Sequence, residues 1–327
     1  MAHGITNTDE MFSVRQTPWH GLGKILPELA TAQEALEAAN LSWQVQKVPV
    51  FAHFPDGSVS STRNYATVRE DTKEVLGVVG TDYTPLQNAD AFKFFDAVCQ
   101  DPNGPKYETA GSLHGGRKVW ILAKMPSFIE VIGHDIIKEY LLLSNTHDGS
   151  KQLEMRWTTV RVVCQNTLSL ASRGVAEVRL RHRSDLTRRI SDVQELLGIT
   201  KANHEFLTEA TAFMLTVKPT EEQITDVLTK LLGNGSEGPE GESETSPQKK
   251  RVKGEIETLY NSSETCNLPG MEGTAWGLLN AITEWSDHNR PYRSAVTDLE
   301  SAQVDSLWFG RGDTFKRKAF DLVTSLK

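Results

Sequence analysis

Residues 136–165 read IIKEYLLLSNTHDGSKQLEMRWTTVRVVCQ, and this stretch decides the fold class. It holds two apolar runs, 136–145 and 154–165, on either side of Thr146-His147-Asp148-Gly149-Ser150. Asp-Gly between two strand-like runs is a strong local signal for a β-hairpin. We therefore predict two long antiparallel strands joined by a turn at Asp148-Gly149.

Strand patterns extend toward the N-terminus from this hairpin. Trp43 to Phe54 alternates between apolar and polar residues, and Pro55 to Ser58 is a turn signal before a second strand near 64–70. Further strands are predicted over 75–80, 119–123 and 178–183. The run 111–118 contains glycines and basic residues but lacks the spacing of a phosphate-binding loop, so we interpret it as a tight turn before a strand.

Helical periodicity dominates the rest of the chain. Thr31 is expected to cap a short helix over 33–39, Asn88 opens another, and Asn166 is expected to cap a short helix through Leu170. After Asp185 the apolar period changes to 3.6, which predicts one helix ending at Gly198. A helix over 200–218 and one after the capping box Thr220-Glu221-Glu222-Gln223 follow.

The order of these elements predicts an α+β fold, with an antiparallel sheet and hairpins in the N-terminal half and helices in the C-terminal half. We divide the chain into a core over 1–232, a disordered acidic, Gly/Ser-rich linker over 233–253, and a helical segment over 254–327 that packs back on the core. The clearest helix of that last segment is 276–287, and we expect Asn280 and Asp287 to be buried and hydrogen-bonded there.

Composition narrows the classes of protein. The 327 residues carry a net charge of −8 and are 38% apolar, which suffices for a core and argues against a protein that coats DNA generally. No run of about 18–20 apolar residues occurs, so no membrane is expected. The first residues do not resemble a signal peptide, and three widely spaced cysteines fit a reducing cytoplasm.

Charge is distributed unevenly along the chain. Residues 151–189 hold nine basic and three acidic residues, a net charge of +6, whereas residues 190–248 hold eleven acids and three lysines. Within the basic stretch, strand periodicity places Arg179, Arg181 and Arg183 on one face, about 6–7 Å apart. This spacing suits successive phosphates of a single nucleic-acid strand, and ion pairs with the acidic helices that follow are the alternative.

Four more residues belong to the predicted nucleic-acid interface: Lys151, Arg156, Trp157 and Arg161. A base stacked on Trp157 would add to the phosphate contacts, and the alternative is that this indole packs in the core. A metal site is a separate hypothesis, in which Glu284, Asp287 and His288 on one helix combine with His147 or Asp148. The alternative there is a buried polar network, and no cofactor other than such a metal is expected.

Several motifs resemble one family in order and spacing. They are Pro18-Trp19-His20-Gly21-Leu22-Gly23, Tyr83 to Asn88, Asn145 to Ser150, Arg161 to Thr167, and Trp276 to Ala281 with Asp287-His288. The chain is identified by them as a member of the phage/plasmid-like protein family, known as domain of unknown function 932. The resemblance implies a cytoplasmic protein of a mobile element in a bacterial host, and it carries over no catalytic residue.

Three hypotheses for function follow. The first is a protein that binds single-stranded nucleic acid, such as a strand-annealing recombination protein that works as a homo-oligomer. The second is a metal-assisted hydrolase or nuclease that uses the helix 276–287. The third is an interaction module that blocks a host factor.

Overall fold

The computed structural model describes most of the chain. The described ranges are 11–14, 24–27, 30–99, 105–133, 135–161, 167–168, 177–182, 193–233, 246–291, 306–307 and 310–326. Within them, no helix is long and apolar enough to cross a lipid bilayer.

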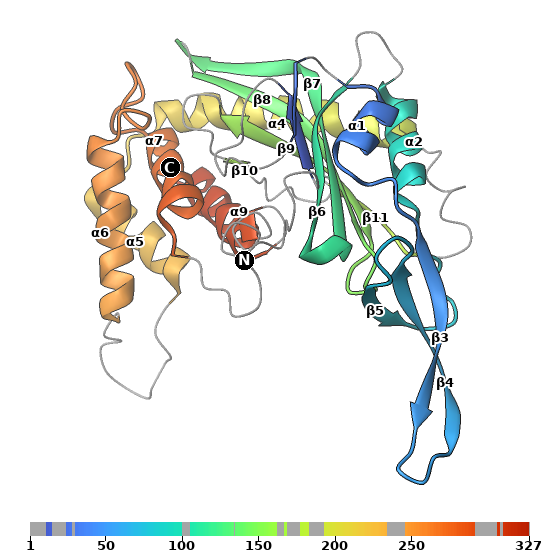
Figure 1. Cartoon of the computed structure of the whole chain (residues 1–327). Helices are drawn as coiled ribbons and strands as arrows, with labels where there is room; N and C mark the ends of the chain where they lie inside the picture. Colours follow the sequence, from blue (N-terminus) through green and yellow to red (C-terminus); the bar gives the residue numbers. More distant parts are fainter. Residues whose placement is uncertain are drawn as a thin grey trace.

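A large, mainly antiparallel sheet forms the centre of the molecule (Figure 1). Its strands lie in the order β10-β9-β8-β7-β6-β1-β2, and β11 also pairs with β9. Their bounds are β1 Met11–Val14, β2 Lys24–Leu26, β6 Lys106–Leu113, β7 Lys118–Ile132, β8 Asp135–Thr146, β9 Leu153–Arg161, β10 Thr167–Leu168 and β11 Glu177–Leu180. The predicted hairpin is confirmed as β8 and β9, and among the described strands only β1 and β2 pair in parallel. The α+β prediction is likewise confirmed.

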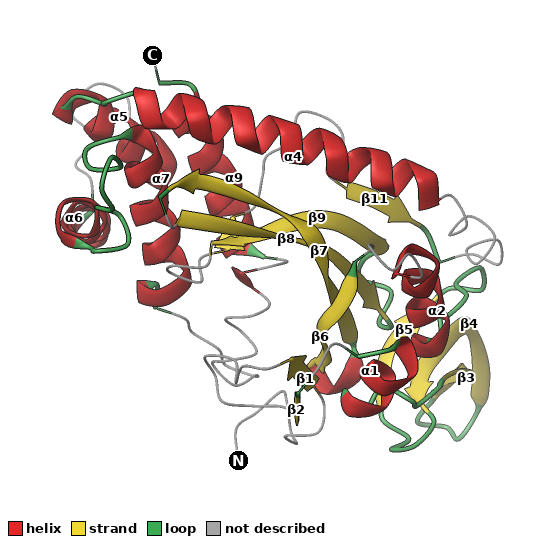
Figure 2. Cartoon of the chain, turned by 90° about the horizontal axis from the view of Figure 1, so that it is seen from above, coloured by secondary structure: helices red, strands yellow, loops and turns green. Residues whose placement is uncertain are grey.

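Both faces of this sheet are buried at its middle. On β8, Leu141 and Leu143 belong to the main core, while Tyr140 and Leu142 belong to a smaller apolar cluster on the opposite face. A continuous apolar run such as 141–143 is typical of a strand covered on both sides. Figure 2 shows the long helix α4 (Val193–Thr216) lying across the sheet on one side.

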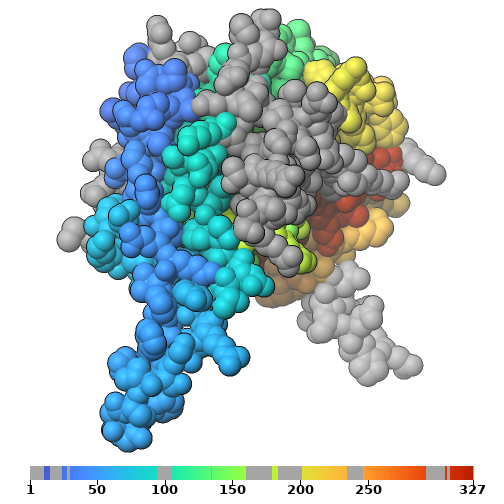
Figure 3. Space-filling model, turned by 90° about the vertical axis from the view of Figure 1, so that its right-hand side faces the viewer, coloured from blue at the N-terminus to red at the C-terminus, as the bar shows by residue number. Residues whose placement is uncertain are grey.

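A second, three-stranded sheet is built from β3 (Val45–His53), β4 (Val59–Arg69) and β5 (Val75–Val79). The β3–β4 hairpin, which we call the arm, projects from the rest of the molecule (Figures 1 and 3). One face of this sheet packs against the main body, where Thr67 is fully buried. The other face exposes Val48 and Val78, which are 41% and 58% exposed.

Two short helices pack against each other and against β6 of the large sheet. Helix α1 (Ala32–Ala38) begins with the predicted cap, because Thr31 Oγ1 accepts from the backbone N–H of Glu34 and the Glu34 carboxylate accepts from that of Thr31. Helix α2 (Asn88–Cys99) begins at Asn88, as predicted. The run 111–118 forms the predicted tight turn, in which His114, Gly115 and Gly116 all have positive φ.

The C-terminal helices pack together and onto the sheet. They are α5 (Glu221–Leu232), α6 (Pro247–Ser262), α7 (Ala275–Glu284), the π-helical turn η2 (Trp285–Asn289) and α9 (Arg311–Thr324). Trp276 of α7 donates from Nε1 to Asp135 at the start of β8, at 3.1 Å. Asn280 and Asp287 are both 3% exposed and hydrogen-bonded, which confirms the prediction for this helix.

Three predicted boundaries are wrong. Helix α4 continues through Gly198, because packing of its later residues Leu207 and Met214 outweighs the roughly 1 kcal/mol that a glycine costs. Residues 167–168 form β10 instead of a helix, since their backbone pairs with the end of β9. Helix α6 begins inside the predicted linker, where Ser246 caps it and Pro247 occupies its first turn. Residues 234–245 of that linker lie outside the described ranges.

Candidate nucleic-acid interface

The turn between β8 and β9 is held by its own polar side chains. Asp148 Oδ1 accepts from the backbone N–H of Ser150 at 2.8 Å, and Gly149 adopts a φ of 76°, which glycine reaches without strain. Thr146 Oγ1 donates to the carbonyl of Lys151 and accepts from its N–H, at 2.9 and 3.1 Å. The turn is therefore a defined structure that fixes the direction of residues 149–152.

This turn packs against the three-stranded sheet at backbone distance. A Cβ atom added to Gly77 would lie 2.5 Å from Asp148 Cα and 2.7 Å from its carbonyl oxygen. A Cβ atom on Gly149 would lie 2.8 Å from Cγ1 of Val79. Glycine at position 77 is thus what allows the two sheets to touch, and β5 lies beside the turn.

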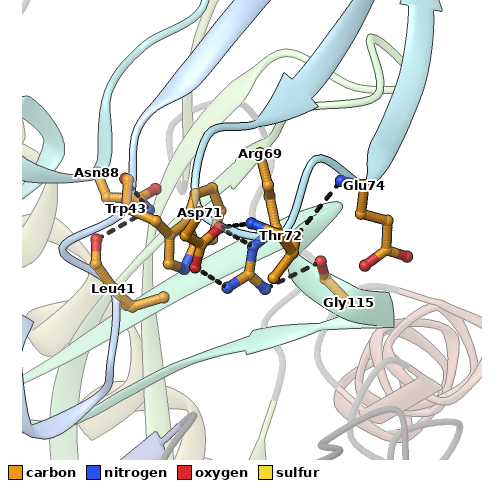
Figure 4. Close-up of polar contacts among 8 residues, drawn as sticks. All are labelled: Leu41, Trp43, Arg69, Asp71, Thr72, Glu74, Asn88 and Gly115. Carbon is orange, nitrogen blue, oxygen red and sulfur yellow. Dashed lines mark hydrogen bonds and ion pairs between the residues drawn. The ribbon is translucent and has the colours of Figure 1, made fainter.

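A polar network beneath the turn joins three further segments (Figure 4). The Arg69 guanidinium lies 4.4 Å from the centre of the Trp43 ring and donates to both carboxylate oxygens of Asp71, at 2.8 and 3.1 Å. It also donates to the carbonyl of Gly115, at 3.3 Å. Hydrogen bonding from Arg69 lowers the pKa of Asp71. Because Arg69 is only 3% exposed, these contacts fix the small sheet against the β6–β7 turn.

His147 completes this anchoring. Its Nε2 lies 3.0 Å from Oδ1 of Asn88, and Asn88 donates from Nδ2 to the carbonyl of Leu41 at 3.0 Å. Its ring meets Trp43 edge-on, with centroids 5.4 Å apart. His147 has no exposed surface, and burial lowers its pKa to about 3. The imidazole is therefore neutral and structural.

The basic residues predicted to bind phosphate are divided by the structure. Arg179 and Arg181 are exposed, whereas Leu180 and His182, which alternate with them along the chain, are buried. The alternation expected of a strand is confirmed for these four residues. Arg179 lies opposite Glu154 in the register of β11 and β9. Arg183 and the side chain of Arg161 lie outside what the structure describes.

Lys151 and Arg181 come together at one pocket. It has a volume of about 380 Å³ and is lined by the turn residues 149–152, by Asp82 and Tyr83, and by Arg181 and His182. The rings of Tyr83 and His182 stack with centroids 4.9 Å apart, and the Tyr83 hydroxyl donates to the carbonyl of Thr146 at 2.8 Å. We call this the Tyr83–His182 pocket.

His182 is the unusual residue of this pocket. It is 7% exposed, and neither ring nitrogen has a hydrogen-bond partner among the described residues. Burial lowers its pKa to about 4, so the ring is neutral near pH 7. The backbone is nevertheless fixed, because the N–H of Thr84 donates to the carbonyl of His182 at 3.1 Å. The pocket thus combines two cationic side chains and the Asp82 carboxylate with a neutral imidazole whose donor and acceptor are not used by the described residues.

Two of the predicted interface residues are corrected. Arg156 is 4% exposed, and its Nη1 donates to Oδ2 of Asp313 on α9 at 2.9 Å, so an internal carboxylate occupies the place of a phosphate. Trp157 is 3% exposed and belongs to the main core, as the packing alternative proposed. Both errors have one cause, which is that β9 is covered on both faces at these positions.

The metal hypothesis gains no support from the arrangement. Asp287 accepts from Lys316 Nζ at 2.9 Å, and Glu284 accepts from the hydroxyls of Ser263 and Thr265. His147 and Asp148 follow the last residue of β8, whereas its first residue, Asp135, is the one that contacts Trp276 of α7, so they lie at the opposite end of this strand from that contact. Nowhere in the described ranges do three or more histidine, cysteine or carboxylate side chains cluster as metal ligands would.

Sequence reasoning missed Tyr83 and His182 as members of the interface. Tyr83 appeared only in the motif Tyr83 to Asn88, and His182 only as a residue within the predicted strand 178–183. The two rings are 99 positions apart in the chain, and they meet because β5 and β11 both end at the β8–β9 turn. Periodicity cannot detect such a contact.

A family model described as "Domain of unknown function (DUF932)" matches residues 75–308. The chain belongs to the DUF932 family. Every residue of the Tyr83–His182 pocket lies inside this DUF932 match, whereas β3 and β4 of the arm precede it and α9 follows it. No curated protein and no solved structure matches the chain.

The two buried histidines make folding of this DUF932 protein dependent on pH. An unfolded histidine has a pKa near ~6.5, whereas the folded values are about 3 for His147 and about 4 for His182. Below pH ~6.5 the unfolded chain binds protons that the folded chain does not. The free energy of unfolding therefore decreases as the pH is lowered from ~6.5 to about 4. We expect urea denaturation at pH 7.5, 6 and 5 to give steadily lower stability, with up to ~1.4 kcal/mol lost per pH unit for each imidazole.

Substitutions identify the source of this slope. The double variant His147→Gln/His182→Phe should have a flatter profile of stability against pH, because glutamine and phenylalanine side chains bind no proton in the unfolded chain. His53→Gln, at an exposed position of the arm, should keep the slope of the unmodified protein. An equally steep profile in the double variant would contradict the assignment to these histidines.

Proposed function

We propose that this protein binds single-stranded nucleic acid at the exposed basic surface formed by Lys151, Arg179 and Arg181. The observation that carries the proposal is the state of Arg181. It is exposed, it lines the Tyr83–His182 pocket, and no carboxylate lies within ion-pair distance of it among the described residues. An unpaired guanidinium beside a lysine in an otherwise acidic chain is suited to contact a phosphate.

The neighbouring groups support a strand of nucleic acid over an isolated phosphate. Arg179 stands two residues before Arg181 on the same exposed face, about 6–7 Å away, which matches the repeat of an extended backbone. The arm begins near the pocket, where Lys47 of β3 donates from Nζ to the carbonyl of Tyr83 at 2.8 Å. Farther out, the arm exposes Phe51 and Phe54, which are 52% and 49% exposed. Exposed aromatic rings can stack with unpaired bases of a strand that extends from the basic surface along the arm.

Titration of fluorescent oligonucleotides tests the proposal. Fluorescence anisotropy with a single-stranded oligonucleotide, across a salt series, should show binding that weakens steeply with salt. The variant Lys151→Gln/Arg181→Gln should lose affinity on the order of tenfold at ~0.1 M salt, with the slope of log K against log salt reduced by about 1.4. The loss should be similar for different sequences, because phosphates carry no sequence information.

The matched control removes two positive charges elsewhere. Lys250 and Arg251 are exposed on α6, at the opposite end of the molecule from the arm (Figure 1). Lys250→Gln/Arg251→Gln should leave affinity and salt slope unchanged. Equal losses of affinity in the two double variants would show that binding depends on the net charge of the protein alone. An affinity unchanged by Lys151→Gln/Arg181→Gln would refute the proposed surface.

Strand annealing in the cytoplasm of a bacterial host, as part of a mobile element, is the wider role that we propose. It requires a homo-oligomer and faster pairing of complementary strands. Light scattering with and without the oligonucleotide measures the oligomeric state. A strand-pairing assay with the two double variants measures the rate at which complementary strands pair. A chain that stays monomeric on the oligonucleotide and does not accelerate pairing would limit the role to binding.

A further inference from the structure

A second basic pocket lies between the end of α5, the residue after η2 and one face of α9. Its volume is about 440 Å³. Leu231 and Arg290 form one side, and Arg311, Phe315 and Lys318 line the other from positions that share a face of α9. We call it the α9 pocket. The α9 pocket shares no lining residue with the Tyr83–His182 pocket, and in Figure 1 α5 lies on the opposite side of the molecule from the arm.

The α9 pocket is lined by three cationic side chains and by no carboxylate. Within the described part of the chain, Arg290 and Arg311 form no ion pair. The Nη1 atom of Arg290 is buried and has no hydrogen-bond acceptor among the described residues. A buried N–H without an acceptor is unfavourable, and an anionic oxygen in the pocket would satisfy it.

Two of the three cationic groups, Arg290 and Lys318, are held in place before any ligand binds. The Arg290 guanidinium lies 5.6 Å from the centroid of the Phe315 ring, and that ring packs against Trp285 with centroids 5.7 Å apart. Lys318 donates from Nζ to the carbonyls of Lys230 and Leu231 at the end of α5. Side chains that are already ordered lose less entropy when they bind an anion.

The acidic residue nearest in sequence does not neutralise this pocket. Asp313 accepts from Arg156 at 2.9 Å and from Arg317 at 3.0 Å, and it does not line the cavity. The cavity also adjoins the first turn of α9, where Gly310 supplies no side-chain cap and the peptide dipoles add to the positive potential. The charged side chains that line the α9 pocket are therefore all positive.

We propose that the α9 pocket binds an oligophosphate anion, such as the phosphate tail of a nucleotide. A guanidinium binds one phosphate group through two parallel hydrogen bonds, so Arg290 and Arg311 together match two linked phosphates. Lys318 adds a third positive charge as a compact ammonium, which lacks the planar fork of a guanidinium. This site does not depend on the proposed nucleic-acid interface.

Isothermal titration calorimetry with inorganic pyrophosphate tests the α9 pocket. We expect saturable binding of one pyrophosphate per chain, at least tenfold tighter than that of orthophosphate or sulfate. Arg311→Gln and Arg290→Met should each weaken binding at least tenfold. Arg311 is exposed, so its variant will keep the fold and remains informative even where Arg290→Met is unstable.

Controls separate this site from general attraction of anions and from the interface proposed above. Arg63→Gln, which removes one charge from the arm, should bind pyrophosphate like the unmodified protein, and so should Lys151→Gln/Arg181→Gln. A nucleoside triphosphate should compete with pyrophosphate, whereas a single-stranded oligonucleotide should not. No saturable binding at millimolar pyrophosphate, equal binding of sulfate, displacement by the oligonucleotide alone, or unchanged binding in Arg311→Gln would each overturn the proposal.

Discussion

Replacing Asp287 with alanine will lower the free energy of unfolding by about 3–5 kcal/mol. The carboxylate lies 2.9 Å from Lys316 Nζ, and the two side chains are 3% and 0% exposed. Without Asp287, the lysine must remain charged in the interior with one fewer partner, or give up its proton there. Either outcome is costly, because water cannot replace the lost carboxylate. Urea denaturation followed by circular dichroism measures the change.

A surface pair of similar geometry provides the control. Asp226 lies 2.7 Å from Lys230 on α5, and both side chains are 58% exposed. Asp226→Ala should cost less than about 1 kcal/mol, because water solvates both groups when the pair is absent. The double variant Asp287→Leu/Lys316→Met should recover much of the loss of Asp287→Ala, since it removes the buried charge altogether. Equal destabilisation by Asp226→Ala and Asp287→Ala would show that burial is not the cause.

Gly77→Ala is expected to destabilise the protein by about 3 kcal/mol. The added Cβ would lie 2.5 Å from Asp148 Cα and 2.7 Å from the Asp148 carbonyl oxygen, so the backbone of one sheet must move away from the other. Because residues 149–152 line the Tyr83–His182 pocket, the same shift should weaken binding of the oligonucleotide. Thermal denaturation and anisotropy titration measure the two effects.

Gly80 supplies the matched control three positions later. No atom lies within 4 Å of a Cβ added there, and its φ is not in the left-handed region. Gly80→Ala should change stability by no more than about 0.5 kcal/mol. A Gly77→Ala variant as stable as Gly80→Ala would mean that the two sheets separate without cost, and it would contradict the close packing described above.

Features that depend on neighbours in sequence were predicted from the sequence. The turn at Asp148-Gly149, the helix cap at Thr31 and the capping box at Thr220 are formed by residues within four positions of one another. The alternation of Arg179, Leu180, Arg181 and His182 follows from the period of a strand. Such features can be predicted without knowing how the helices and strands pack against one another.

Features that depend on distant elements could not be predicted. The partner of Arg156 is 157 positions away on α9, and nothing in the local pattern distinguishes that arginine from Arg179 or Arg181. The role of Gly198 also depended on packing, since a helix stop and a tolerated interior glycine look alike in sequence. For the candidate site, charge and periodicity therefore identified Lys151 and Arg181, while the stacked rings beside them required the fold.

The connection of β1 to the large sheet has a consequence for synthesis of the chain on the ribosome. Phe12 pairs with Ala110, so β1 emerges 98 residues before the strand that it joins. At about 5–20 residues per second, this apolar segment waits roughly 5–20 s for its partner. The strands β7, β8 and β9 pair with neighbours made immediately before them. The yield of folded protein should therefore depend on how fast the ribosome translates the codons for residues 15–105, and little on the codons for the hairpins.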